Sequence, residues 1–85
     1  MEILYKPSFV RAYKNLPPEV KTIAKEKIEL LKDTNNHERL RVHKLRGSLK
    51  NCYSFSITHS HRAIFTNEKS NTITLLAIGD HDIYQ

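Results

Sequence analysis

The hydrophobic pattern of the N-terminal part of the chain predicts one short strand and one helix. Residues 3–5 form an apolar run that Lys6 and Pro7 end, because the residue before a proline is restricted to extended conformations. From Ser8, a candidate N-cap, apolar residues recur with the spacing of one helical face. These residues are Phe9, Ala12, Tyr13 and Leu16.

A second, longer helix is expected directly after the first. Pro17 and Pro18 stop the first helix and start the next, since proline is tolerated in a first turn. The polar residues 33–36 end this second helix. Its two faces differ as in an amphipathic helix, with apolar positions at Val20, Ile23, Ala24, Ile28 and Leu31. The two helices should form a hairpin whose apolar faces need a sheet to cover them.

The second half of the chain has the patterns of that sheet. Tyr53, Phe55 and Ile57 alternate with polar residues, which is the period-two pattern of a strand with one buried face. The most apolar run in the chain, at residues 73–78, predicts a central strand. The predicted strands are 41–45, 53–57, 61–66 and 73–78, connected by a turn at Gly47, a tight link at 58–60 and a polar loop at 67–71.

This order of elements, β–α–α–β–β–β–β within 85 residues, indicates an α+β fold. We expect a short N-terminal strand and a helix hairpin packed on a four-stranded antiparallel sheet, with a candidate extra short edge strand. Residues 1–85 should form one domain, since a typical domain has roughly 100–150 residues.

The composition limits where in the cell the protein is expected and which kinds of site it can contain. The chain has no run of about 20 apolar residues, so it predicts no transmembrane helix and no membrane partner. Its N-terminus lacks the apolar core of a secretion signal, and a cytoplasmic location is expected. The single cysteine, Cys52, excludes an internal disulfide and a multi-cysteine zinc site.

The positive charge of the chain is concentrated in residues 37–50, here called the basic block. It holds five Lys/Arg and one acid, whereas the other 71 residues hold nine Lys/Arg and eight Asp/Glu. Such a block indicates that a polyanion is bound at one place, although a solvated edge strand guarded against mispairing has the same composition. A helix-turn-helix DNA reader fits badly, because the block follows the two helices instead of lying on them.

Three short clusters contain residues that could do chemistry. His43 stands in the sequence HKLRG at 43–47, and Arg62 follows two histidines at 59 and 61. The third cluster is the C-terminal tail, with His81 and Tyr84. His59 and His61 also make half of a zinc site, but no clear third ligand accompanies them, and no metal is expected.

In this order the motifs resemble the RelE/ParE superfamily of bacterial toxin–antitoxin systems, in particular its RelE/YafQ-like branch, over the whole chain. HKLRG at 43–47 is similar to the family's KLRG box, and Arg62 stands where the family has a strand arginine. The tail IGDHDIY at 78–84 is similar to the G-x-H-x-x-Y/F ending of the YafQ-like branch.

The resemblance implies a cofactor-free, metal-independent endoribonuclease, an mRNA interferase that cuts messages in the ribosomal A site. A cognate antitoxin protein would neutralise it. In this reaction the RNA 2′-OH attacks the adjacent phosphate and the 5′-oxygen leaves, which requires proton transfer and charge stabilisation. Histidine suits the proton transfers because its unperturbed pKa lies near about 6.5, and arginine suits the phosphate.

Residue-wise transfer from the family assigns roles in this chain. His81 becomes the leading general acid or base, with His43 as its partner in proton transfer or in orienting the 2′-OH. Arg62 becomes the phosphate clamp and Tyr84 the stacking or positioning residue. Contacts to messenger or ribosomal RNA are expected from Lys44, Arg46, Lys50, Arg41, His59 and His61.

Two other functions stay open from the sequence. A ParE-like toxin of the same fold binds DNA gyrase and cuts no RNA, and such a surface has no need of paired imidazoles. In the RelE branch two catalytic lysines follow the KLRG box, at the places that Ser54 and Ser56 take in this chain. This departure favours the third alternative, a catalytically decayed module that binds RNA or protein.

Overall fold

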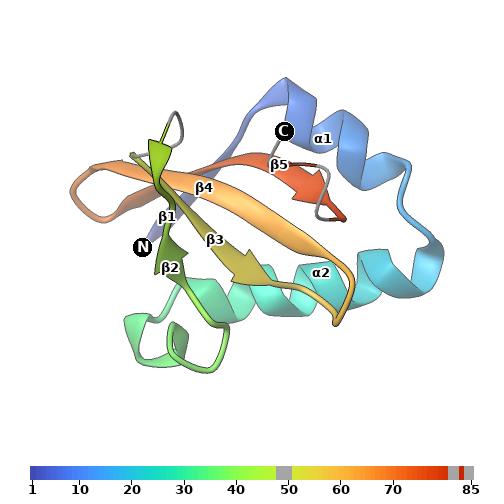
Figure 1. The fold of residues 1–85 in the computed structure, drawn as a ribbon, viewed down its shortest axis with the longest axis horizontal. Helices are drawn as coiled ribbons and strands as arrows, with labels where there is room; N and C mark the ends of the chain where they lie inside the picture. Colours follow the sequence, from blue (N-terminus) through green and yellow to red (C-terminus); the bar gives the residue numbers. More distant parts are fainter. Residues whose placement is uncertain (48–50, 81–82, 84–85) are drawn as a thin grey trace.

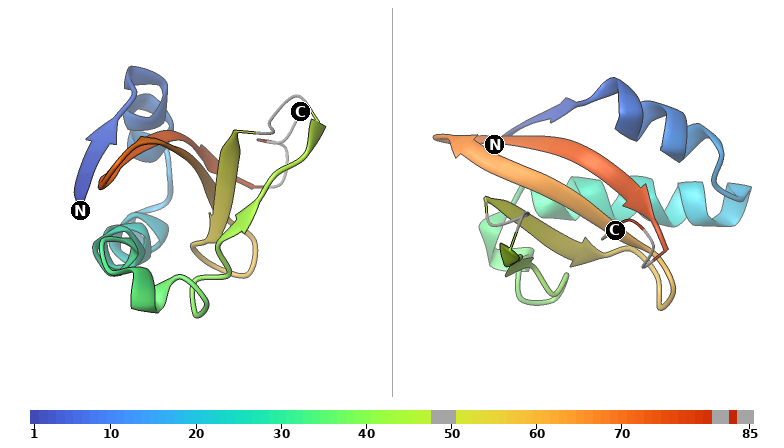
Figure 2. Two further views of the ribbon diagram at one scale, coloured as in Figure 1. Left: turned by 90° about the vertical axis from the view of Figure 1, so that its left-hand side faces the viewer. Right: turned by 45° about the horizontal axis from the view of Figure 1, so that its top comes forward.

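One sheet carries two helices on one of its faces (Figures 1 and 2). The computed structural model describes residues 1–47, 51–80 and 83. In chain order the elements are β1 (Glu2–Tyr5), α1 (Pro7–Lys14), α2 (Pro18–Leu31), the 3₁₀ turn η1 (Thr34–Asn36), β2 (His43–Lys44), β3 (Cys52–Ser56), β4 (Arg62–Lys69) and β5 (Thr72–Gly79). Neither helix within these residues is long and apolar enough to cross a membrane.

The sheet of the described chain has five strands in the order β1-β5-β4-β3-β2. β2 to β5 pair antiparallel, as predicted, and the predicted N-terminal strand adds to the edge, parallel to β5. A parallel neighbour requires a long connection, which the rest of the chain supplies. The predicted α+β class is confirmed.

Both helices begin at a proline in their first turn. Ser8 is not the N-cap of α1, so that prediction is wrong: Lys6 occupies the cap position without a side-chain hydrogen bond. Ser8 lies inside the first turn, and its hydroxyl donates to the Leu76 carbonyl at 3.1 Å. This bond ties α1 to β5 instead of closing the helix end.

The main core lies between the helices and one face of the sheet (Figure 2, left). Phe55 and Ile57 are buried in it, which confirms the predicted buried face of β3. Phe65 packs beside Phe55 with ring centroids 5.9 Å apart. The other buried members are Phe9, Val20, Ala24, Ile28, Leu31, Leu40, Ala63, Ile73, Leu75 and Ile78.

The largest differences from the predicted strand lengths are at β2 and β4. β2 spans only two residues, because Arg41 has a φ of 60° and leaves the extended conformation. β4 continues to Lys69 through the predicted polar loop, since a tight turn keeps Lys69 paired with Thr72. Asn71 supports this turn with a φ of 62°, a conformation that asparagine tolerates.

A register shift in the β4–β5 pair decides which side chains reach the face away from the helices. Ile64 pairs with Ala77 and Phe65 with Leu75, so β5 carries one extra residue, Leu76. Ile78 therefore returns to the core, and Gly79 pairs with Arg62 on the opposite face. Bulges commonly re-aim side chains in this way beside functional sites.

Candidate functional site

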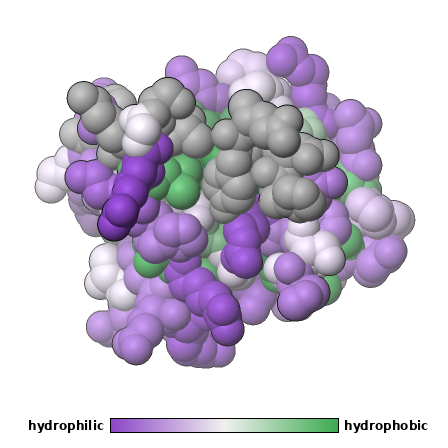
Figure 3. Space-filling view, viewed as in Figure 1, coloured by the Kyte–Doolittle hydropathy of each residue, from purple (hydrophilic) through white to green (hydrophobic). Residues whose placement is uncertain are grey.

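The sheet face turned away from the helices carries the candidate site. Figure 3 shows this side of the molecule, and hydrophilic residues predominate over the loop that follows α2 and over β2, at its lower left. Cys52, Ser54 and Ile64 are buried beneath this face, and all three lie outside the main core cluster. This face therefore has a small buried layer of its own, on which its polar side chains lie.

His43 is fixed through both nitrogens of its ring. It lies on β2 opposite Ser54 of β3. Nδ1 is 3.0 Å from the Arg41 carbonyl oxygen, which can only accept, so Nδ1 carries a proton and donates it. Nε2 lies 3.1 Å from the Ser54 hydroxyl. In the neutral ring the hydroxyl donates to Nε2, and in the imidazolium it accepts from it.

Arg62 is fixed from the next strand. It begins β4 and pairs with Ser56, two residues beyond Ser54 on the same face of β3. Its Nη1 donates a hydrogen bond to the Ser56 hydroxyl. A guanidinium has five N–H donors in a planar fork, so the remaining donors stay available to an anion.

These two side chains line one hollow. A shallow depression of about 480 Å³ is bounded by Arg41, His43, Leu45 and Arg62. A second depression of about 510 Å³ shares Leu45 and adds Lys44, Arg46, Gly47 and Asn51. The structure therefore brings together five of the predicted site residues in adjoining hollows, and the cations among them provide a positively charged surface.

The remaining predicted site residues are distributed differently. His81, Tyr84 and Lys50 lie outside the described residues. His59 is exposed, and His61 lies in the β3–β4 connection, with its Nδ1 2.9 Å from the Thr58 hydroxyl. No group of three or more potential metal ligands occurs among the described residues.

Ile83 packs against the end of β5. The Ile83 amide donates to the Asp80 carbonyl at 3.2 Å. A Cβ at Gly79 would lie only 2.7 Å from Cγ2 of Ile83, so Ile83 packs directly on this glycine. Because Gly79 pairs with Arg62, Ile83 lies at the end of β5 that is next to the arginine.

Sequence reasoning missed what Ser54 and Ser56 do. It treated them as places where catalytic lysines are lost, whereas each of them holds one predicted site side chain. The available signal was their shared face on the strand, opposite Phe55. Without the strand register, however, nothing in the sequence could match Ser54 with His43 or Ser56 with Arg62.

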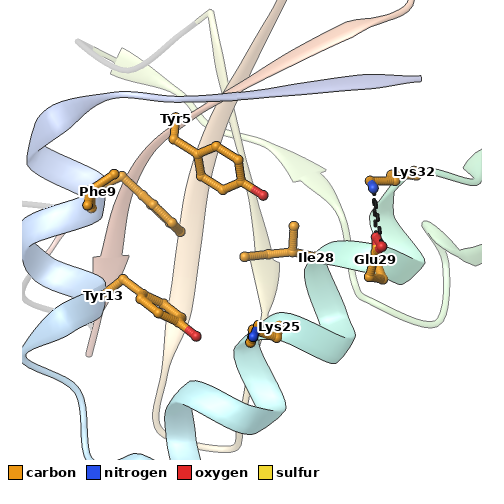
Figure 4. A pocket seen from close by; sticks show the side chains of 8 residues that line it. Tyr5, Phe9, Tyr13, Lys25, Ile28, Glu29 and Lys32 are labelled. Carbon is orange, nitrogen blue, oxygen red and sulfur yellow. Dashed lines mark hydrogen bonds and ion pairs between the residues drawn. The ribbon is translucent and has the colours of Figure 1, made fainter.

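A different hollow, of about 430 Å³, opens between α1 and α2 on the helical side (Figure 4). Tyr5, Phe9 and Tyr13 form one wall, and Ile28 lies opposite them. At its rim Glu29 accepts a hydrogen bond from Lys32, and this bond raises the pKa of Lys32. The walls of this hollow are mainly aromatic and aliphatic, and none of the predicted site residues lines it.

No family model and no curated protein matches the sequence. The structure, in contrast, resembles several solved structures. YafQ from Escherichia coli BL21(DE3) aligns with a TM-score of 0.81 and 16% identity over 98% of this chain and 96% of its own. The heterotetrameric YoeB–YefM toxin–antitoxin complex from Staphylococcus aureus contains a chain that aligns with a TM-score of 0.76 and 22% identity, over 95% and 97%. The YoeB dimer from the same organism aligns with a TM-score of 0.70 and 28% identity, over 95% of this chain and 97% of its own.

The chain has the RelE/ParE toxin fold. The predicted resemblance is thereby confirmed, and it extends over nearly the whole length of both partners in each comparison. In this fold, His43 and Arg62 lie on strands that flank β3 on either side. Two of the residues that carried the resemblance therefore line one hollow.

Proposed function

We propose that this chain is the toxin of a toxin–antitoxin pair and acts in the cytoplasm as a metal-independent, ribosome-dependent mRNA endoribonuclease. One observation carries the proposal. His43 and Arg62, 19 positions apart in sequence, line a single open hollow beside the cationic Lys44 and Arg46. A hollow of this kind suits an RNA phosphate, since a guanidinium matches two phosphate oxygens.

Arg62 stabilises the reacting phosphate. When the 2′-oxygen bonds to phosphorus and the bond to the 5′-oxygen breaks, negative charge grows on the non-bridging oxygens. The guanidinium, already held by Ser56, meets this charge without reorganising, and such preorganised donors are among the strongest contributions to catalysis. The products are a 2′,3′-cyclic phosphate and a free 5′-hydroxyl.

The proton transfers fall mainly to His81. Both nitrogens of His43 are engaged within the protein, so this ring serves better to supply positive charge, in its protonated form, than to take the proton of the 2′-OH. His81 moves the proton, and Tyr84 stacks on a base. Lys44, Arg46, Lys50 and Arg41 hold the backbone of messenger or ribosomal RNA.

The protein partner is a cognate antitoxin. The support is the fold shared with a chain of the YoeB–YefM toxin–antitoxin complex. By holding the toxin, such a partner would keep the site from the ribosome until the partner is removed.

Primer extension on a defined message in a purified translation system tests the function. Wild type should cut within A-site codons only when ribosomes are present, and His81→Ala and Arg62→Ala should abolish the cuts. An intact message with wild type would reject the ribonuclease. Gyrase supercoiling and ribosome-binding assays would then distinguish a ParE-like inhibitor from a binding module.

A further inference from the structure

We propose that Ser54 and Ser56 are positioning residues, which hold the His43 ring and the Arg62 guanidinium in the geometry that the reaction needs. The inference rests on the proposed ribonuclease function. It gives a role to two residues that stand where the RelE branch has catalytic lysines. It depends on three features of β3: the burial of Ser54, the two hydrogen bonds and the spacing of the serines.

Ser54 anchors an exposed ring to the interior of the sheet. The serine is fully buried, with 0% of its surface exposed, whereas His43 is exposed. A buried hydroxyl left without a partner costs about 1–3 kcal/mol, so the bond to Nε2 is maintained in the folded protein. Because a hydroxyl can donate or accept, this bond survives when His43 gains or loses a proton.

Ser56 determines which edge of the Arg62 fork is free. Its hydroxyl accepts from Nη1, which leaves the other N–H groups to face the hollow. A flexible arginine loses side-chain entropy when it binds a phosphate, up to about 1.5–2 kcal/mol. The bond to Ser56 removes part of that loss before the substrate arrives.

The spacing of the serines sets the distance between the two groups. Ser54 and Ser56 are two residues apart on one face of β3, which is roughly 6.6 Å along the strand. His43 lies on β2 and Arg62 on β4, each roughly 4.8 Å to one side. The ring and the guanidinium therefore approach β3 from opposite sides.

Small side chains at positions 54 and 56 are part of this arrangement. A lysine at 54 would have to enter a fully buried position or displace His43. In this chain the positive charge therefore stands on a neighbouring strand, at Arg62, and β3 supplies the hydroxyls that hold Arg62 and His43. The two serines carry no charge themselves and instead hold His43 and Arg62 in place.

The test compares Ser54→Ala, Ser56→Ala and Ser56→Thr with Ser70→Ala, a matched control at the exposed β4–β5 turn. Ser54→Ala and Ser56→Ala should each lower kcat about five- to tenfold, because one positioning hydrogen bond is lost. Ser56→Thr keeps the hydroxyl and should restore most of the rate, and Ser70→Ala should match wild type. Unchanged kcat in both alanine variants would overturn the proposal.

A second readout does not depend on activity. ¹⁵N NMR of the histidine rings should show His43 with its proton on Nδ1 in the neutral state and an ordered ring, and Ser54→Ala should make this ring mobile. If wild type cuts no RNA but this change occurs, the function fails and the positioning role of Ser54 stands. If the ring behaves identically in wild type and Ser54→Ala, the positioning role of Ser54 is rejected.

Discussion

Arg62 is the residue on which the proposed reaction depends most directly. Because one N–H group binds Ser56 and the others remain available, its geometry matters as well as its charge. We expect Arg62→Gln to lower single-turnover cleavage roughly 10²–10³-fold, as when one preorganised donor is removed. Arg62→Lys should restore only part of the rate, since an ammonium cannot bind Ser56 and two phosphate oxygens with the same planar fork.

Arg11→Gln is the matched control for these variants, because Arg11 is an exposed arginine on α1, outside the basic block. It should cleave at nearly the wild-type rate. If Arg62→Lys cleaved at the wild-type rate, the planar shape of the guanidinium would not matter, and its charge alone would explain the contribution of Arg62.

At the scale of single residues, the sequence singled out two side chains that lie together in the structure, but it did not predict how they are held. His43 and Arg62 were singled out by residue type and motif, and they do share a hollow. Their partners were not predictable, because a pairing of residues 43 with 54 and 56 with 62 depends on strand register. A local pattern contains no information on register between strands.

At the scale of elements, the end of β5 sets how closely Ile83 can pack on the sheet. Gly79 is in contact with Ile83, and a methyl group there would lie 2.7 Å from Cγ2 of that residue. We expect Gly79→Ala to displace the tail and lower cleavage by about tenfold or more, since misplacing a catalytic group by about 1 Å can cost 10²-fold. The measurement is the cleavage rate, with thermal unfolding recorded in parallel.

The Ile83→Ala background provides the control for this contact. There the Cγ2 atom is absent, so adding Gly79→Ala should have a much smaller further effect. Equal effects in both backgrounds would show that the two residues do not interact.

The element boundaries show where local patterns stop being sufficient. Period two predicted β3 well, because one of its faces enters the core. The polar residues that continue β4 to Lys69 indicated a loop, but pairing with β5 overrides their local preference. β1 was predicted as a strand, yet its parallel place beside β5 is a property of the assembled sheet.

At the scale of the whole molecule, charge predicts how binding responds to salt. The chain has a net charge of +5, and Lys44 and Arg46 line the hollow next to the candidate site. If both contact RNA phosphates, Lys44→Gln combined with Arg46→Gln should reduce the slope of log K against log salt by about 1.4, at about 0.7 per contact on single-stranded RNA. Fluorescence anisotropy with a short RNA at several salt concentrations measures the slope.

Lys25→Gln tests whether any lost charge has the same effect. Lys25 lines the hollow between the helices, on the other side of the sheet. The salt slope should stay near the wild-type value in this variant. An equal decrease in both proteins would indicate diffuse attraction over the surface in place of binding at the basic block.

The two faces of β3 separate the stability of the molecule from its activity. Phe55 is fully buried in the main core, whereas Ser56 on the other face is only half-buried and contacts Arg62. Phe55→Ala should therefore lower the free energy of unfolding by about 3–5 kcal/mol, a large share of the stability of a small domain. For a domain of this size the melting temperature should fall by more than about 12 °C.

Ser56→Ala should leave the melting temperature within a few degrees of wild type and lower only the cleavage rate, since it deletes one partly exposed hydroxyl. Calorimetry on both variants, with cleavage assayed well below each transition, distinguishes the two effects. A large loss of stability in Ser56→Ala would mean that the site face also supports the fold, and its effect on cleavage could then not be ascribed to the position of Arg62.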